Sequence, residues 1–441
     1  MTVQTPPFRP AGDAIARHDA PGSKEPAPMN PSKIVVINDT SLPRGGTANL
    51  ALLALRHLRA RGVAAHWVCG DDGANPEFAE LGVPVTAAHQ SPLLERGRVD
   101  AARAGAYNTP ARDMLARYIV EHDDPDTVYH LHGWAQILSP SVFSALAPVA
   151  ERVFVHAHDM FLACPNGVYM DYRKGEVCTR RPLGLDCVTT NCDKRAYHHK
   201  LWRVARHAML RRTFAPELPW AGVFQIHPDM QSRLERGGIP GRFCRTLRNP
   251  ADPYSATRIR AEENGGLLYV GRLEADKGVL ALARAARRTG AAVTFVGEGT
   301  LRATLEAEYP EFPVTGWKSR DEIGAIAAGM RALVMPSLHP EPFALVLPEA
   351  IHSGLPVLVA QTALMSREIA ARGLGLSFDA SDDAAFDAAL RAIAALPPAR
   401  LREMSEAGFA GDARLALSVD EWVSGLLDAY RGAVLRQRPA E

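Results

Sequence analysis

Two glutamates, Glu341 and Glu349, lie eight residues apart in a polar segment that runs into a short helix. Pro348 favours the opening of that helix because proline lacks an N–H, and a strand is expected over residues 356–360 after Gly354. The carboxyl ends of parallel strands meet at one edge of a sheet, so both acids are expected at the edge where α/β proteins bind ligands. Acids near a helix start are also favourable dipole charges, so their surroundings must decide between the two interpretations.

A second segment, residues 265–278, combines an apolar strand, the glycine turn at Gly271 and two cations, Arg272 and Lys277, five residues apart at a helix start. A lone pair of this kind would be two solvated side chains. Positive charge at a helix N-terminus opposes the helix dipole, however, and needs an anion for compensation. The pattern therefore favours a pyrophosphate held by a guanidinium fork, a point charge and backbone N–H groups.

The strand, the Arg-x4-Lys-Gly run and the Glu-x7-Glu pair together resemble the donor half of retaining glycosyltransferases of the family 4 type. The resemblance covers nearly everything from residue 33 onward and is specific in the C-terminal half. It implies an α/β protein with the GT-B fold, in which two facing Rossmann-like domains enclose a deep interdomain cleft. It also implies a nucleotide-sugar donor carrying UDP or GDP, and no cofactor for catalysis.

The resemblance also implies roles for single residues. Arg272 and Lys277 would stabilise the leaving diphosphate, where charge grows as the glycosidic bond breaks. Glu349 would bind the ribose hydroxyls, and Glu341 the hydroxyls of the donor sugar. Glu341 is also a candidate nucleophile, but we favour a front-face reaction in which the departing phosphate helps to deprotonate the acceptor. The catalytic candidates are Glu341, His158, Arg272 and Lys277.

Further donor contacts are expected from the backbone N–H groups of Phe343, Ala344 and Leu345. The chain departs from the family pattern at Ala344, where glycine is usual, and a methyl group there changes how closely the backbone approaches a ligand. Trp317 lies where such enzymes contact the edge of the nucleobase. An indole packed structurally is the alternative.

In the N-terminal half, strand 33–38, a glycine turn and a helix over 48–61 predict a β-α-β opening. Gly46 in that turn is expected to aim its amide at a phosphate or acceptor. Two pairs, His130 with His132 and His156 with His158, end successive strands. By resemblance, His158 contacts the donor and His132 is the second candidate, although a histidine that closes a strand is often structural.

Length and composition set limits on the class of protein. A chain of 441 residues is too long for one core, and its net charge of +1 gives no field that would select nucleic acid. No apolar run is long enough to span a membrane, and residues 1–32 lack the apolar centre of a secretory signal. We expect a cytoplasmic protein. The expected units are a disordered tail (1–32), an acceptor domain (33–250) with an insertion (160–215), a donor domain (251–418) and a helix returning to the first domain (419–441).

The insertion contains four of the six cysteines, at intervals of thirteen, eight and four residues. Four thiolates could hold a structural zinc tetrahedrally, but no Cys-x2-Cys pair is present, so free thiols are the alternative. The four candidates are Cys164, Cys178, Cys187 and Cys192.

Seven lysines and arginines fall within residues 194–212, with apolar residues at helical spacing that include Trp202. Such a helix suits the anionic inner face of the cell membrane. A surface helix packed on the first domain is the alternative.

The first functional hypothesis is a nucleotide-sugar-dependent glycosyltransferase whose acceptor is a glycan, a lipid-linked sugar or another glycoconjugate. A nucleotide-sugar epimerase or a phosphorylase on the same fold is the second. A non-catalytic subunit that binds a carbohydrate or lipid carrier is the third, and loss of Glu341, Arg272 or Lys277 would mark it. All three residues are present.

Overall fold

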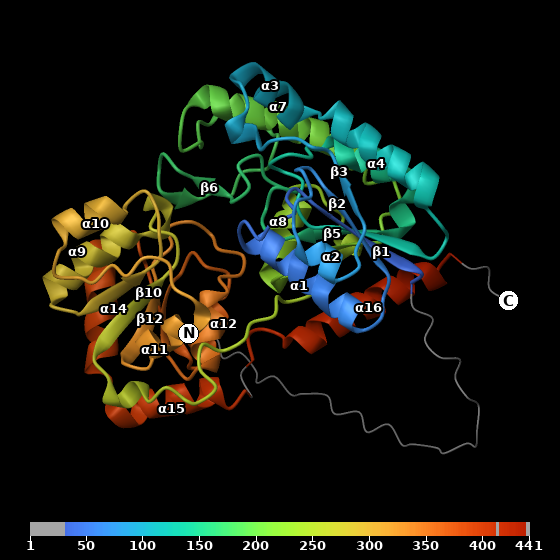
Figure 1. Cartoon of the computed structure of the whole chain (residues 1–441). Helices are drawn as coiled ribbons and strands as arrows, with labels where there is room; N and C mark the ends of the chain where they lie inside the picture. The colour runs from blue at the N-terminus through green and yellow to red at the C-terminus, as the bar shows by residue number, and fades with distance from the viewer. Residues whose placement is uncertain (1–30, 412–413, 438–441) are drawn as a thin grey trace, which may run out of the picture.

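The computed structural model describes residues 31–411 and 414–437, and most of their strands form two parallel sheets in two lobes (Figure 1). The predicted tail lies outside the described residues apart from Pro31 and Ser32. Strands and helices alternate in both lobes, which is the pattern that a parallel sheet with helical crossovers requires. The predicted α/β fold class is confirmed.

The first sheet has seven strands in the order β3-β2-β1-β4-β5-β8-β9. Its central strands are buried, apart from Lys33 at the start of β1, because helices cover both faces. The strands are β1 (Lys33–Asn38), β2 (Ala65–Cys69), β3 (Val85–Ala87), β4 (Thr127–Leu131), β5 (Val153–Ala157), β8 (Gly222–Gln225) and β9 (Cys244–Thr246).

The helices of this lobe differ in length, and several short 3-10 turns join them. They are α1 (Gly46–Ala60), α2 (Glu77–Glu80), α3 (Arg98–Ala106), α4 (Thr109–His122), α5 (Ser141–Leu146), α6 (Leu185–Thr189), α7 (Tyr197–Thr213) and α8 (Gln231–Arg236). The insertion adds a small antiparallel pair, β6 (Met170–Asp171) with β7 (Glu176–Val177), which extends toward the other lobe (Figure 1).

The second sheet has five strands in the order β11-β10-β12-β13-β14. Residues 313–315 lie beside this sheet without forming a strand of it, since Val314 makes a single isolated bridge to Phe295. One bridge is too short to continue the hydrogen-bond ladder as a strand. The five strands are β10 (Gly266–Val270), β11 (Val293–Val296), β12 (Met330–Met335), β13 (Val357–Ala360) and β14 (Gly375–Phe378).

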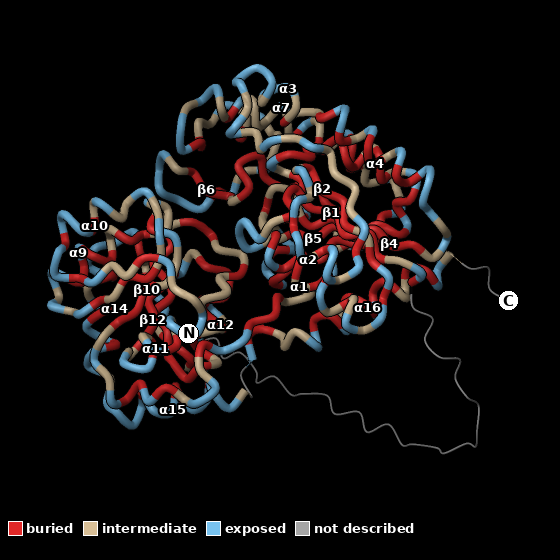
Figure 2. The backbone as a smooth tube through the Cα atoms, viewed as in Figure 1, coloured by how far each residue is buried: buried red, intermediate tan, exposed pale blue. Residues whose placement is uncertain are grey.

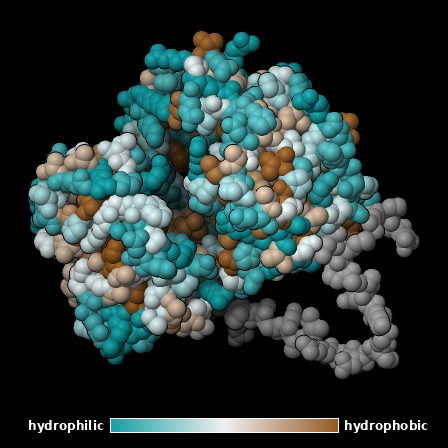
Figure 3. All heavy atoms as spheres, in the orientation of Figure 1, coloured by the Kyte–Doolittle hydropathy of each residue, from teal (hydrophilic) through white to brown (hydrophobic). Residues whose placement is uncertain are grey.

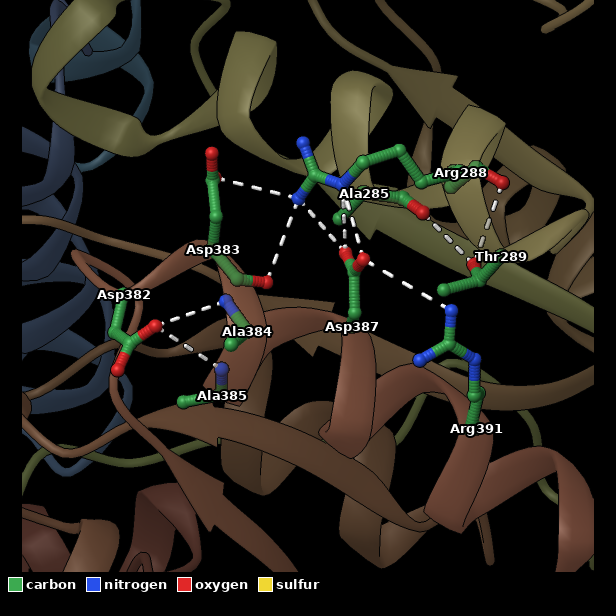
Figure 4. A network of polar contacts seen from close by, with 10 residues as sticks. Ala285, Arg288, Thr289, Asp382, Asp383, Ala384, Ala385, Asp387 and Arg391 are labelled. Carbon is green, nitrogen blue, oxygen red and sulfur yellow. Dashed lines mark hydrogen bonds and ion pairs between the residues drawn. The ribbon is translucent and has the colours of Figure 1, made fainter.

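The helices of the second lobe cover both faces of this sheet. Arg288 on α9 binds Asp387 on α14, at 2.7 Å from Nη2 to Oδ1, and so ties two covering helices together (Figure 4). Ser319 and Glu322 form a reciprocal cap at the start of α11. The helices are α9 (Val279–Thr289), α10 (Arg302–Glu308), α11 (Arg320–Ala327), α12 (Val346–His352), α13 (Ser366–Ala371), α14 (Asp383–Ala395) and α15 (Pro398–Phe409).

Two chain segments connect the lobes, and they pair with each other. Pro250 and Leu417 form a parallel bridge, and the Ala251 N–H donates to the Leu417 carbonyl. After this crossing, α16 (Val419–Leu435) packs against the first sheet, whose strands are buried (Figure 2). Trp422 and Tyr430 on α16 are fully buried. Burying each large side chain contributes about 2 kcal/mol, so α16 anchors the end of the chain to the first lobe.

Each sheet has one point where consecutive strands are added on opposite sides. In the first sheet this point lies between β1 and β4, and in the second between β10 and β12. Crevices outside the carboxyl ends of the strands at such a point are where open α/β sheets bind ligands. The segments that follow these four strands are therefore the places to look for a site.

Candidate functional site

The segments after β10 and β12 meet at the switch point of the second sheet. Gly278 lies between them with φ 73°, and a Cβ at this position would lie 2.1 Å from the carbonyl oxygen of Pro336. Any side chain there would force the two segments apart. The glycine therefore lets Lys277, at the end of the first segment, reach the second.

Glu341 is the centre of this site. Its carboxylate forms an ion pair with Lys277 Nζ, and it accepts a hydrogen bond from Ser337 Oγ at 2.8 Å. His339 Nε2 lies 3.4 Å from the same oxygen. Burial acts to raise the pKa of Glu341, but the Lys277 charge, His339 and the two hydrogen bonds outweigh it, so the pKa is lowered. Glu341 is therefore an ionised acceptor.

Arg272 lies beside this pair with an exposed side chain. Its carbonyl accepts a hydrogen bond from Tyr269 Oη at 2.7 Å. Burial raises the pKa of Tyr269, the Glu341 charge raises it further and the Arg272 charge lowers it, so both charges act on one hydroxyl. Within the described part of the chain, the Arg272 guanidinium has no hydrogen-bond or ion-pair partner. It is free to bind an anion.

Glu349 lies in the first turn of α12, as expected, although the helix begins at Val346, two residues before Pro348. Its Oε1 is 2.9 Å from Arg320 Nη2. Burial raises the pKa of Glu349, while Arg320 and the hydroxyl of Tyr254 oppose that shift. Sequence reasoning missed both partners, because Arg320 is 29 positions away and opens a different helix.

The remaining donor candidates flank this site. Phe343, Ala344 and Leu345 directly precede α12, and their backbone N–H groups have no acceptor among the described residues. The Trp317 side chain is 74% exposed, so the alternative in which its indole packs structurally is not supported. An exposed indole beside the end of β11, where Gly297 N–H donates to the Gly316 carbonyl, is available for stacking.

Gly45 and Gly46 open α1 at the switch point of the first sheet. Gly45 has φ 98°, and a Cβ on either glycine would meet no atom within 4 Å. The first turn of α1 therefore faces open space. The nearby Asp39 was missed from sequence: its carboxylate accepts backbone N–H groups of residues 136–138, at 2.8 to 2.9 Å, and so holds the loop after β4.

His158 and His132 occupy different positions relative to the surface. His158 is partly buried at the end of β5, and its Nε2 lies 3.0 Å from His132 Nδ1. His132 is 3% exposed, and its other nitrogen contacts His130 at 3.2 Å. Both nitrogens of His132 are thus occupied by other imidazoles. The prediction that His132 contacts a ligand directly is not supported.

The four cysteines of the insertion are buried and free, but they do not gather as a metal site. Among the described residues, one group places three metal-ligating atoms within 4.8 Å of one another, and it consists of histidines. The predicted zinc site is therefore not supported. The thiols face N–H donors instead: Lys200 Nζ to Cys187 Sγ at 3.3 Å, Asn166 Nδ2 to Cys192 Sγ at 3.6 Å and Arg180 Nη1 to Cys178 Sγ at 3.7 Å. Burial raises the pKa of Cys164 to about 11, which keeps that thiol protonated.

The basic helix α7 packs on the first lobe, and the membrane interpretation is not supported. Trp202, its expected interfacial residue, donates from Nε1 to the Ala102 carbonyl on α3 at 3.0 Å. Lys200 is 1% exposed, and the Arg206 guanidinium lies over the Trp134 ring. The cations that should meet an anionic surface are partly used inside the protein. No helix in the described ranges has the length and apolar character needed to cross a bilayer.

The insertion instead approaches the second lobe. Lys194 Nζ lies 3.8 Å from Asp276 Oδ2, in the segment that carries Lys277. Burial raises the pKa of Tyr172 to about 12, and the charges of Asp276 and Glu341 add to the shift. The molecular surface is hollowed between the two lobes (Figure 3). Residues of both lobes therefore border one cleft.

Comparison with known proteins places this site in a family. A family model described as glycosyl transferases group 1 matches residues 256–410. A GDP-mannose-dependent alpha-mannosyltransferase of Corynebacterium glutamicum is 24% identical over 343 residues, which are 75% of this chain and 72% of that protein. The glycogen synthase of Mycobacterium tuberculosis is 33% identical over 269 residues, 56% of this chain and 61% of that enzyme.

Solved structures share the whole architecture. Sucrose-phosphate synthase from Thermosynechococcus elongatus superimposes with a TM-score of 0.68 at 16% identity, over 92% of this chain and 100% of that one. HepE of Anabaena, in complex with UDP and glucose, gives a TM-score of 0.62 at 14% identity, over 91% and 100%. At these identities the structures establish the fold. Residues 256–410 thus belong to the group 1 glycosyl transferases, and the chain is a glycosyltransferase with the GT-B fold.

Proposed function

We propose that this glycosyltransferase is a retaining enzyme that moves a sugar from a nucleoside diphosphate sugar to a glycan, a lipid-linked sugar or another glycoconjugate. The donor binds the second lobe, and the acceptor binds the first. Closure of the cleft expels water, which favours transfer over hydrolysis.

The observation that carries this proposal is the meeting of Lys277 and Glu341 at the switch point of the second sheet. A cation and an ionised acid at one point match the two needs of the reaction. The leaving diphosphate gains negative charge and needs a cation, while the sugar hydroxyls need an acceptor. Arg272, exposed and unpaired among the described residues, supplies a second cation with a bidentate fork.

The ribose and the nucleobase extend away from this point. Glu349 accepts hydrogen bonds from the ribose hydroxyls, since Arg320 fixes the position of its carboxylate at 2.9 Å. Trp317 offers its exposed indole face to the base. The N–H groups of residues 343–345 donate to the donor sugar or its phosphates.

We favour a front-face reaction for the transfer step. Glu341 is engaged by Lys277, Ser337 and His339, an arrangement suited to a fixed acceptor. The departing phosphate takes the acceptor proton, and His158 contacts the donor sugar from the first lobe. A covalent glycosyl-Glu341 adduct, found by mass spectrometry of the enzyme mixed with donor, would contradict this mechanism.

The donor is a UDP- or GDP-sugar. Relatives named as GDP-mannose-dependent and a structural neighbour bound to UDP support these two classes. Thermal unfolding in the presence of each nucleoside diphosphate discriminates between them, because a ligand that binds the folded state raises stability by mass action. One diphosphate should raise the melting temperature selectively. If none does, the proposal fails.

A further inference from the structure

Four histidines lie on one face of the first sheet, beneath α16. His130 and His132 are two positions apart on and after β4, as are His156 and His158 on and after β5, so each pair points to the same face. The two strands are neighbours, with Leu131 paired to Val155. His130, His132 and His156 are at most 3% exposed, and His158 is partly buried.

The four rings form a chain of contacts that ends at Tyr430 on α16. His158 Nε2 lies 3.0 Å from His132 Nδ1, and His132 Nε2 lies 3.2 Å from His130 Nδ1. His130 Nε2 lies 3.2 Å from His156 Nδ1. Tyr430 Oη approaches His130 Nδ1 at 2.5 Å, so that nitrogen is shared by the hydroxyl and His132.

Every ring in the chain is neutral near pH 7. Burial lowers the pKa of all four histidines, to about 3 for His158. Burial also raises the pKa of Tyr430 far above its usual value, so its hydroxyl keeps its proton. Each imidazole therefore has one N–H donor and one bare acceptor nitrogen, and a chain of such rings can run in two directions.

The direction of donation along the histidine chain follows from which buried donors would be left without an acceptor. If Tyr430 donates to His130 Nδ1, His130 donates from Nε2 to His156, and His132 joins by donating from Nε2 to the same His130 Nδ1 in a three-centre hydrogen bond. His132 Nδ1 is then bare and accepts from His158 Nε2–H. In this direction the His156 Nε2–H is a buried donor without an acceptor in the described structure. In the opposite direction there are two such donors, the Tyr430 hydroxyl and the His158 Nδ1–H. Orphaned buried donors are rarer than orphaned acceptors, which favours the first direction.

We infer that Tyr430 is a positioning residue that sets the tautomer of His158 through His130 and His132, so that His158 carries its proton on Nε2 and offers a bare Nδ1. That atom is buried and has no partner among the described residues. A bare imidazole nitrogen accepts a hydrogen bond from a hydroxyl group. This inference rests on the proposed function, in which the hydroxyl belongs to the donor sugar.

A metal ion bound by His130, His132 and His156 is the competing explanation, since their ligand atoms lie within 4.8 Å of one another. The contacts argue against it. His130 turns opposite nitrogens toward its two neighbours, and one imidazole cannot aim both nitrogens at a single ion. A hydrogen-bond chain accounts for both contacts.

The test measures tautomers directly in protein labelled with 15N-histidine, by long-range 1H–15N correlation. In the wild type His158 should be protonated at Nε2, and Tyr430→Phe should convert it to a mixture of tautomers. Tyr129→Phe is the matched control. Tyr129 lies on β4 next to His130, but its hydroxyl donates to Asp123 at 2.8 Å and lies outside the chain of histidines. Its spectrum should keep the wild-type tautomer.

Turnover gives the second readout. Tyr430→Phe should lower kcat about ten-fold with a smaller change in the donor KM, as loss of a supporting hydrogen bond typically does. His132→Leu breaks the same chain of histidines at another position. The double variant should therefore lose no more kcat than the more affected of the two single variants.

Three results would overturn the inference: a wild-type His158 protonated at Nδ1, an unchanged tautomer and kcat in Tyr430→Phe, or a stoichiometric metal bound to these histidines. The tautomer readout needs no activity, so a failure of nucleotide binding would count against the proposed function and leave this inference to be decided separately.

Discussion

Lys277 and Glu341 are 64 positions apart in the sequence. Their side chains form an ion pair at the switch point of the second sheet, between β10 and β12. The pair forms because β10 and β12 are adjacent strands, so the segments that leave their carboxyl ends must meet. Gly278 removes the side chain that would keep those segments apart. In the proposed function, Lys277 stabilises the leaving diphosphate and Glu341 accepts hydrogen bonds from the donor sugar.

Replacing Glu341 by Gln should lower kcat by about a hundred-fold, because a fixed charge at the reacting centre is lost. The amide keeps the shape of the side chain, so the variant should remain folded, with a lower melting temperature because Lys277 loses its anionic partner. Steady-state kinetics with the donor identified by thermal shift measures the effect. Glu77→Gln, which removes a charge from a pair on the first lobe, is the control. Equal rates in the two variants would contradict a role for Glu341.

Replacing Glu349 by Gln should weaken binding of the nucleoside diphosphate about ten-fold, because an ionised acceptor forms stronger hydrogen bonds than an amide. The effect should depend on the ribose hydroxyls. Calorimetry with the 2′,3′-dideoxy nucleotide therefore completes a double-mutant cycle. The wild type and the variant should bind that analogue with almost equal affinity. An undiminished difference would remove Glu349 from the ribose site.

Trp317→Phe should leave the free energy of unfolding within about 0.5 kcal/mol of the wild type, since the indole is 74% exposed. If the nucleobase stacks on this indole, nucleotide should quench part of the tryptophan fluorescence, and that part should vanish in the variant. Urea unfolding and a fluorescence titration measure the two effects. Quenching that survives unchanged in Trp317→Phe would place the base elsewhere.

Stability should fall as the pH is lowered from about 7 to about 5. Buried histidines such as His158 and His207, whose folded pKa values are about 3, stay neutral in the native state. The unfolded chain protonates them below about pH 6.5 and so binds more protons, which favours unfolding. Each such residue contributes a slope of about 1.4 kcal/mol per pH unit.

Urea unfolding at several pH values measures this slope. His207→Leu should reduce it by the contribution of one residue, and His89→Gln, at a side chain that is 71% exposed, should leave it unchanged. A wild-type stability that is flat or rises toward pH 5 would contradict the assignment of these histidines as neutral.

Local patterns predicted much of the fold and the positions in it of several candidate site residues. The glycine turn after β10, the helix over Val279–Thr289 and the acidic segment after β12 all follow from residues close together in the chain. The ends of strands also indicated where His132 and His158 would lie. These features depend on periodicity and turn chemistry, which act over a few residues.

Contacts between distant segments could not be predicted in that way. Arg320 on Glu349, Asp39 on the loop after β4 and Tyr430 on His130 join positions 29 to 300 residues apart. Such pairs arise from strand order and helix packing, which no local pattern records. The cysteine spacing misled for the same reason, since thiols that are close in the sequence need not bring three ligand atoms within 4.8 Å of one another.

Calorimetric titration of a nucleoside diphosphate into the wild type and Lys277→Met tests the account most directly. We expect the diphosphate selected by thermal shift to bind the wild type and to lose at least about ten-fold in affinity in the variant. Lys33→Met, which removes an ammonium that donates to the His122 carbonyl on the first lobe, should bind as the wild type does. Equal affinity of Lys277→Met and the wild type, or no binding of any nucleoside diphosphate, would contradict the assignment of this cleft as a sugar-donor site.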